Sequence, residues 1–140
     1  MNVKIKKLTE TAKLPCYAHE GDAGIDFFSD EEKIIKSKET AVISTGISME
    51  IPHGYAGLVW DRSGLAVKNS LTCLAGVVDS GYRGEIKIVV HNLRNQDFKV
   101  DKGMKIAQML IQPVISADLK EADELAESQR QHKGFGSTGL

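Results

Sequence analysis

The chain lacks the features that define several large classes of protein. It has no stretch of 18 apolar residues and no basic segment followed by an apolar one, so nothing in it indicates a membrane span or export. It also has no Gly-x-x-x-x-Gly-Lys-[Ser/Thr] segment, which excludes a P-loop. We therefore expect a cytoplasmic protein that makes no use of a membrane and that binds any phosphate by other means.

Cysteine and histidine are also scarce. The two cysteines, Cys16 and Cys73, form no Cys-x-x-Cys pair, so we expect reduced thiols and no disulfide. The four histidines show no His-x-x-x-His or His-x-Glu spacing, and a structural zinc site is not expected. The formal net charge of -1 argues against a surface that coats nucleic acid. An anionic ligand would have to be bound by a local cluster of residues.

What the chain does contain is a pattern of short β-strands. With 140 residues, 41% of them hydrophobic and 26% charged, it has the size and composition of one soluble domain. Apolar and polar residues alternate at 47–51 and 85–88, and more briefly at 3–5 and 98–100. Gly, Asn, Asp and Pro separate such segments as far as about residue 116. The pattern predicts an all-β fold, a barrel or sandwich of the jelly-roll type.

Two segments have helical character. The sequence SGLAVK, residues 63–68, is suited to one or two helical turns. Residues 119–130, LKEADELAESQR, contain strong helix formers but few apolar positions. An acidic, solvated linker fits the composition of residues 119–130 as well as a helix does, and the sequence leaves both open.

The first candidate for chemistry is the loop DRSGLA, residues 61–66. Arg62 offers a planar fork of donors suited to phosphate oxygens, Ser63 adds a hydroxyl, and Gly64 lets a ligand approach the backbone. A plain turn has the same composition, so this segment alone is weak support for a binding site.

Two further segments carry polar groups among apolar residues. In GVVDSGYRGEI, residues 76–86, Asp79 and Tyr82 lie three apart in a glycine-flanked turn. Asp79 closes an Asx-turn or serves as a positioned general base, and Tyr82 is a core-edge residue or part of a site. In KIAQMLIQP, residues 105–113, Gln108 interrupts a buried strand. A buried amide needs partners, so Gln108 bonds backbone groups or points into a polar site.

The end of the chain is unusual for a terminus. RQHKGFGSTGL, residues 130–140, combines three glycines with a phenylalanine, two hydroxyls, an arginine and a lysine. A disordered tail would contain glycine and serine too. The aromatic ring and the groups able to bind an anion also suit an arm that closes over a ligand.

Taken together, these segments resemble a known family. In chain order AGID (23–26), RSGLA (62–66), GVVDSGYRGEI (76–86), IAQMLI (106–111) and GFGSTG (134–139) are similar to the five motifs of the homotrimeric deoxyuridine triphosphatase (dUTPase) family. The resemblance covers essentially the whole chain and implies a jelly-roll fold. It also implies hydrolysis of dUTP to dUMP and pyrophosphate, which limits uracil incorporation into DNA and supplies dUMP for dTMP synthesis.

The resemblance implies a role for each motif residue. Asp79 would activate the water that attacks the α-phosphorus, and Tyr82 would pack against the deoxyribose and exclude UTP. The hairpin from Cys73 to Asp79 would bind the uracil edge, and the Arg62 and Gln108 segments the phosphates. The implied substrate contacts are Arg62, Ser63, Gly64, Cys73, Gly76, Val77, Val78, Tyr82, Lys87, Gln108, Arg130, Phe135, Gly136, Ser137 and Thr138.

The family also implies a cofactor and an active site that is shared between subunits. Mg²⁺ would bind mainly through the substrate triphosphate, with Asp26 ordering its hydration indirectly through water. Residues 1–129 would form the jelly-roll core and linker, and residues 130–140 a mobile arm. Phe135 would stack on the uracil while the arm's arginine and hydroxyls cap the γ-phosphate. In the homotrimer each site would be shared: one chain gives the Arg62 and Gln108 segments, a second the hairpin, and a third the arm.

The sequence departs from the family pattern at three places. Asp61 stands where the family usually has proline or a similar neutral residue, which predicts weaker phosphate binding. Cys73 stands where many relatives have asparagine, so one contact to the base is expected to be missing. The arm has Gln131-His132-Lys133 where the family usually has glycines and one variable residue, which predicts a stiffer and more positive arm.

Two other functions are alternatives to dUTP hydrolysis. The dCTP deaminase branch of the same fold needs a glutamate on the strand after the hairpin, and Val89 occupies that position here. A non-catalytic protein that uses the nucleotide site as a switch for a partner would not need Asp79, which is present.

Overall fold

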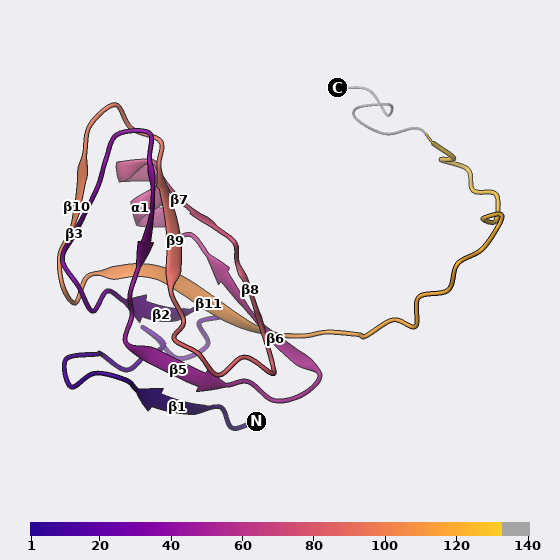
Figure 1. Ribbon diagram of the computed structural model, residues 1–140, viewed down its shortest axis with the longest axis horizontal. Helices are drawn as coiled ribbons and strands as arrows, with labels where there is room; N and C mark the ends of the chain where they lie inside the picture. Colours follow the sequence, from indigo (N-terminus) through magenta and orange to yellow (C-terminus); the bar gives the residue numbers. More distant parts are fainter. Residues whose placement is uncertain (133–140) are drawn as a thin grey trace.

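The computed structural model describes residues 1–132, and within them the regular secondary structure consists of strands and one short helix (Figure 1). The prediction of an all-β fold is confirmed. In chain order the elements are β1 (Lys4–Lys7), β2 (Ile25–Phe28), β3 (Lys33–Ile35), β4 (Thr40–Ile43), β5 (Ile47–Glu50), β6 (Tyr55–Trp60), α1 (Ser63–Asn69), β7 (Leu71–Leu74), β8 (Val77–Asp79), β9 (Ile88–Asn92), β10 (Phe98–Val100) and β11 (Lys105–Pro113).

The strands form small antiparallel sheets, with strand orders β2-β11-β6-β8, β4-β9-β7, β1-β5 and β10-β3. The long strand β11 is central, because β2 pairs with one of its edges and β6 with the other. In this register Gln108 lies opposite Asp26 on one side and opposite Trp60 on the other. Pairing between segments distant in sequence therefore brings three of the predicted motifs to one place.

The core is aliphatic and follows the alternation predicted from the sequence. Ile47, Met49, Ile51, Ile86 and Ile88 are all buried, and they pack in one cluster with Phe27 and the apolar residues of β11. Ser48 breaks the pattern, since it is buried too. Its hydroxyl donates to the carbonyl oxygen of Arg83 at 2.7 Å, which satisfies the buried polar group.

The two segments with helical character behave differently. Residues 63–69 form α1 as predicted, and the helix ends at Ser70, whose φ of 48° is left-handed. Residues 119–130 form no helix, so the linker interpretation is the right one of the two left open. Beyond β11 the chain runs away from the body of the domain (Figure 1). Its last backbone hydrogen bond to the body among the described residues joins Val114 N–H to Gly54 O at 2.9 Å.

Both cysteines are free thiols, as expected, with Cys16 exposed and Cys73 partly buried. Within residues 1–132 no helix is long and apolar enough to cross a membrane.

Candidate active site

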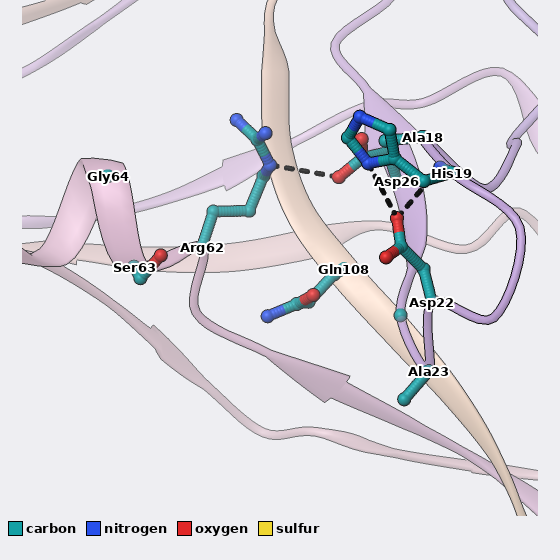
Figure 2. Close-up of a pocket in the computed structure, with 10 residues that line it drawn as sticks. Ala18, His19, Asp22, Ala23, Asp26, Arg62, Ser63, Gly64 and Gln108 are labelled. Atoms are coloured by element: carbon teal, nitrogen blue, oxygen red, sulfur yellow. Dashed lines mark hydrogen bonds and ion pairs between the residues drawn. The ribbon is translucent and has the colours of Figure 1, made fainter.

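The first candidate pocket is a cavity of about 360 Å³ between the start of α1 and the loop before β2 (Figure 2). Five of the residues predicted to bind phosphates or order a metal line it, and they come from β2, the N-cap and first turn of α1, and β11. The lining residues are Ala18, His19, Asp22, Ala23, Gly24, Asp26, Arg62, Ser63, Gly64 and Gln108. A Cβ on Gly64 would meet nothing within 4 Å, so the space over this residue is open.

Asp26 holds Arg62 at this pocket. The Nε atom of Arg62 donates to Oδ1 of Asp26 at 2.9 Å, and the Nζ atom of Lys105 lies 2.7 Å from Oδ2. Oδ2 is buried and the Lys105 contact lacks hydrogen-bond geometry, so that contact is an ion pair only. The Asp26 side chain is 7% exposed, and two cations compensate its buried charge.

Gln108 has both of the roles that the sequence left open. Its Nε2 atom donates to the carbonyl oxygen of Asp61 at 2.8 Å, and its side chain also lines the cavity. Gly24 makes room for it, because a Cβ at that position would lie 2.9 Å from Gln108 Cδ and closer still to Oε1. Gly24 was not predicted as a site residue, although its place inside the AGID segment was the available signal.

Asp61 does not face its neighbour Arg62. Its carboxylate accepts hydrogen bonds from the Thr72 hydroxyl at 3.0 Å and from the backbone N–H of Cys73. It is not part of the cavity lining either. The premise for weaker phosphate binding, a carboxylate placed beside the phosphate-binding arginine, is therefore wrong for this chain.

The second candidate pocket is a cavity of about 250 Å³ formed by the hairpin and the strands behind it. It brings together the predicted base, the predicted sugar gate and the predicted uracil contacts. The lining residues are Val59, Ala75, Val77, Val78, Asp79, Tyr82, Glu85, Ile86, Lys87 and Val89. Asp79 ends β8, and the Tyr82 N–H donates to its carbonyl oxygen at 3.1 Å, which closes the turn.

Two contacts within the hairpin turn hold the Tyr82 ring. Its hydroxyl donates to the carbonyl oxygen of Glu85 at 3.0 Å. Gly84 lies directly beneath the ring, since a Cβ there would be 2.5 Å from the Tyr82 hydroxyl oxygen and 2.7 Å from Cζ. Gly84 thus permits a ring position that any other residue would obstruct.

Glu85 was not predicted as a site residue. Its Oε1 atom accepts from the backbone N–H groups of Thr45 at 3.1 Å and Gly46 at 2.9 Å, and its Oε2 lies 3.7 Å from Lys87 Nζ. The carboxylate is therefore engaged in anchoring the segment before β9 that carries Lys87. No sequence signal could have indicated this, because Thr45 and Gly46 lie on a distant turn.

Two residues predicted to bind uracil lie outside both cavity linings. Cys73 is on β7, where burial and the nearby Asp61 carboxylate raise the pKa of its thiol to about 12. Gly76 lies against β6: the Val59 N–H donates to its carbonyl oxygen at 2.7 Å, and a Cβ would be 2.7 Å from Val59 O. Gly76 allows the hairpin to approach β6 closely.

The predicted residues thus fall into two groups. Arg62, Ser63, Gly64, Gln108 and Asp26 line the first cavity, Val77, Val78, Asp79, Tyr82 and Lys87 line the second, and the two linings share no residue. Arg130 lies in the segment beyond β11. Phe135, Gly136, Ser137 and Thr138 lie outside the described residues.

No group of three or more His, Cys, Asp or Glu side chains within residues 1–132 could hold a metal ion. Both oxygens of Asp26 already contact cations.

The sequence and the fold match one class of hydrolase. A sequence model of the dUTPase family matches residues 10–139. The chain therefore belongs to the dUTPase family.

Named relatives cover the whole chain. The deoxyuridine 5'-triphosphate nucleotidohydrolase of Clostridium acetobutylicum is 55% identical over 142 residues, covering 100% of this chain and 98% of the relative. The enzyme of the same name from Trichodesmium erythraeum is 49% identical over 141 residues, covering 99% of each.

Solved structures agree on the fold. The Staphylococcus bacteriophage 80alpha dUTPase with dUPNHPP superimposes with a TM-score of 0.93 at 32% identity, over 99% of each chain. A dUTPase variant from phage phi11 of S. aureus, described with a structural Mg(II) ion, gives a TM-score of 0.85 at 29% identity. That alignment covers 91% of this chain and 100% of the phage chain. The jelly-roll architecture expected from the sequence is that of these dUTPases.

Proposed function

We propose that the chain is a dUTP diphosphatase that hydrolyses dUTP to dUMP and pyrophosphate. The observation that carries this proposal is the division of the motif residues between two cavities of complementary chemistry. One contains an arginine, a hydroxyl and an amide suited to phosphate oxygens. The other combines a carboxylate, an aromatic ring and open backbone, as a base, a sugar gate and a uracil edge require.

Asp79 is the proposed general base. It is exposed at the end of β8, and the bond from Tyr82 N–H to its carbonyl oxygen fixes the backbone that carries it. A carboxylate held in this way can accept a proton from water as the water attacks the α-phosphorus. The oxygen–phosphorus bond to the leaving pyrophosphate then breaks, and dUMP remains.

Tyr82 is the proposed sugar gate. Its ring is held by the hydroxyl bond to Glu85 O and by the close packing on Gly84. A ring fixed in this way cannot move aside for a ribose 2′-hydroxyl, which supports selection of dUTP over UTP.

We propose that Mg²⁺ reaches the site on the triphosphate. The metal neutralises phosphate charge when bound. Arg62, Ser63 and Gln108 are the side chains proposed to bind the phosphate oxygens around it. Because both Asp26 oxygens contact cations, its proposed part is to hold Arg62, and an indirect contact to Mg²⁺ through water stays a prediction.

We propose that the site is completed between subunits of a homotrimer. The absence of any residue common to the two linings supports this, because a single dUTP must contact both groups at once. The linker also supports it, because residues 114–132 run away from the body of their own domain (Figure 1). The free thiols of Cys16 and Cys73 support a reducing compartment such as the cytoplasm.

The test is pyrophosphate release from dUTP, dCTP, dTTP and UTP, each with Mg²⁺. We expect dUTP to be turned over far faster than the other three. Equal rates for dUTP and UTP would contradict the assignment of Tyr82. Ammonia release from dCTP would indicate a deaminase instead, a function that the apolar Val89 in the second cavity disfavours.

A further inference from the structure

Asp61 joins three separate elements through one residue. It lies between β6 and α1, directly before Arg62. Its carboxylate accepts from the Thr72 hydroxyl and the Cys73 N–H on β7, and its carbonyl oxygen accepts from Gln108 Nε2 on β11. The side chain therefore fixes the loop to one strand while the backbone fixes it to another.

The bond to Cys73 meets a need created by the topology. β7 is the edge strand of the sheet β4-β9-β7, so its N–H groups that point away from β9 have no strand to pair with. The Asp61 carboxylate accepts one of them. A buried donor left without a partner costs more than the bond itself contributes, so this contact is important for the position of β7.

The elements that Asp61 joins lead to different cavities. Arg62, which follows Asp61 in the chain, lines the first cavity. Gln108, whose side chain donates to the Asp61 carbonyl oxygen, lines it as well. Beyond Cys73 the chain continues through Leu74 into residues 75–79, which carry the hairpin wall of the second cavity.

We propose that Asp61 is a positioning residue for both cavities. Its carboxylate sets the distance between the Arg62 loop and β7, and its carbonyl oxygen holds the Gln108 amide. The proposal rests on the proposed function, because its kinetic test uses dUTP. Asp61 departs from the usual family pattern, and the proposal gives this residue a structural role: its carboxylate bonds to β7 and does not face the phosphate site.

The test compares Asp61→Ala with Asp61→Asn. Asparagine keeps the shape: its side-chain oxygen can accept from Cys73 N–H, and its amide can donate to the Thr72 hydroxyl, which is able to accept. Alanine removes both acceptors. We expect Asp61→Ala to raise the KM for dUTP by about 3- to 30-fold, the effect of losing the one or two hydrogen bonds that hold the Arg62 loop against β7. We expect Asp61→Asn to stay within about twofold of the unsubstituted enzyme.

Asp97 provides a matched control. Its carboxylate also accepts from one side chain, Lys36 at 2.8 Å, and from one backbone N–H, that of Ser37 at 2.9 Å. It lines neither cavity. Asp97→Ala should lower the melting temperature without raising KM. If it raises KM as much as Asp61→Ala does, the effect is general loss of stability and the proposal is overturned.

Further outcomes separate this proposal from the proposed function. Should Asp61→Ala fail to fold, Thr72→Val removes only one of the two bonds and is expected to give a smaller rise in KM. An unchanged KM in both Asp61→Ala and Thr72→Val overturns the positioning role. An equal rise in KM in Asp61→Asn and Asp61→Ala overturns it too.

If the unsubstituted chain does not hydrolyse dUTP, the proposed function fails. Hydrogen exchange at the Cys73 amide then still tests Asp61. Exchange should accelerate in Asp61→Ala and remain slow in Asp61→Asn, and equal protection in all three proteins overturns the proposal.

Discussion

Asp26 and Arg62 form a partly buried ion pair in which Nε and Oδ1 are 2.9 Å apart, the carboxylate is 7% exposed and the Arg62 side chain is 32% exposed (Figure 2). The same carboxylate contacts Lys105 through its other oxygen at 2.7 Å. One buried anion thus holds a cation on each side, and only Arg62 of the two lines the first cavity. The pair sets where the guanidinium is presented to a ligand.

Asp26→Asn is expected to damage both stability and binding. The neutral amide would leave two cations without a counterion, but their side chains are 32% and 36% exposed, so the cost should be smaller than the roughly 3 kcal/mol typical of a fully buried pair. The KM for dUTP should rise because Arg62 loses its support. Urea denaturation and steady-state kinetics measure the two effects. Glu50→Gln is the control, since it breaks the exposed Lys4 pair at 3.3 Å and should change neither quantity appreciably.

Asp79→Asn should preserve the fold and nucleotide binding while turnover is lost. The substitution is nearly isosteric and removes the oxygen that accepts the proton, and loss of a general base typically lowers the rate by about 10²–10⁴-fold. Calorimetry with the dUTP analogue dUPNHPP measures binding, and pyrophosphate release measures turnover. Near-normal turnover would show that another group is the base.

Gly84→Ala should weaken selection against UTP. The added methyl group would lie 2.5 Å from the Tyr82 hydroxyl oxygen, so the ring has to leave its present position. The ratio of kcat/KM for dUTP to that for UTP should fall toward the value of Tyr82→Ala. Gly81→Ala in the same hairpin is the control, because a Cβ there meets nothing within 4 Å. An unchanged ratio in Gly84→Ala would mean that selection lies elsewhere.

Deleting the residues after Gln129 should leave the trimer intact and abolish activity, because every strand of the described structure precedes that point. The truncated chain and full-length Asp79→Asn, each inactive alone, are then refolded together. If the arm acts on a neighbour's hairpin, some mixed trimers contain a site with Asp79 from one chain and Phe135 from another, and activity returns. An inactive mixture would show that each arm serves its own chain's hairpin.

Cys73 should be inert toward alkylating reagents near pH 8. Burial, and to a smaller extent the charge of Asp61, raises the pKa of its thiol to about 12, so the reactive thiolate is scarce. A Cys16→Ser protein should therefore react with iodoacetamide only after unfolding.

The raised pKa of Cys73 also makes the free energy of unfolding depend on pH. The folded pKa of Cys73 is raised above the reference value of 9.0, so its contribution to stability is fully present below about pH 9. That contribution is lost as pH rises from 9 to about 12. Cys73→Ser should show a smaller decline in unfolding free energy over this interval, measured by urea denaturation at several pH values.

Periodicity and composition predicted what depends on local sequence. The alternation at residues 47–51 correctly predicted which isoleucines and methionine are buried, and SGLAVK correctly predicted a short helix. Gln108 stood out because a lone amide in an apolar strand must find partners, and it does so at Asp61. Each of these inferences needs only the residues of one segment.

What the sequence could not predict depends on register between distant strands. Asp61 stands next to Arg62 in the chain, yet its carboxylate bonds to β7, and Asp26 is the residue that bonds to Arg62. Gly84 and Gly24 look like ordinary turn residues until the Tyr82 ring and the Gln108 amide are seen against them. The separation of the motifs into two cavities is likewise a property of the folded chain.

The exposed segment beyond β11 has a consequence for the proposed arm. Leu119 and Leu125 are each 90% exposed, so these two apolar side chains of the linker do not pack into the core of the domain. Insertions or deletions there should leave the melting temperature unchanged. They should instead change the effective concentration of the arm at its site, which falls roughly as the −3/2 power of tether length once the span is reached. Linker length would then tune turnover without altering any contact in the folded domain.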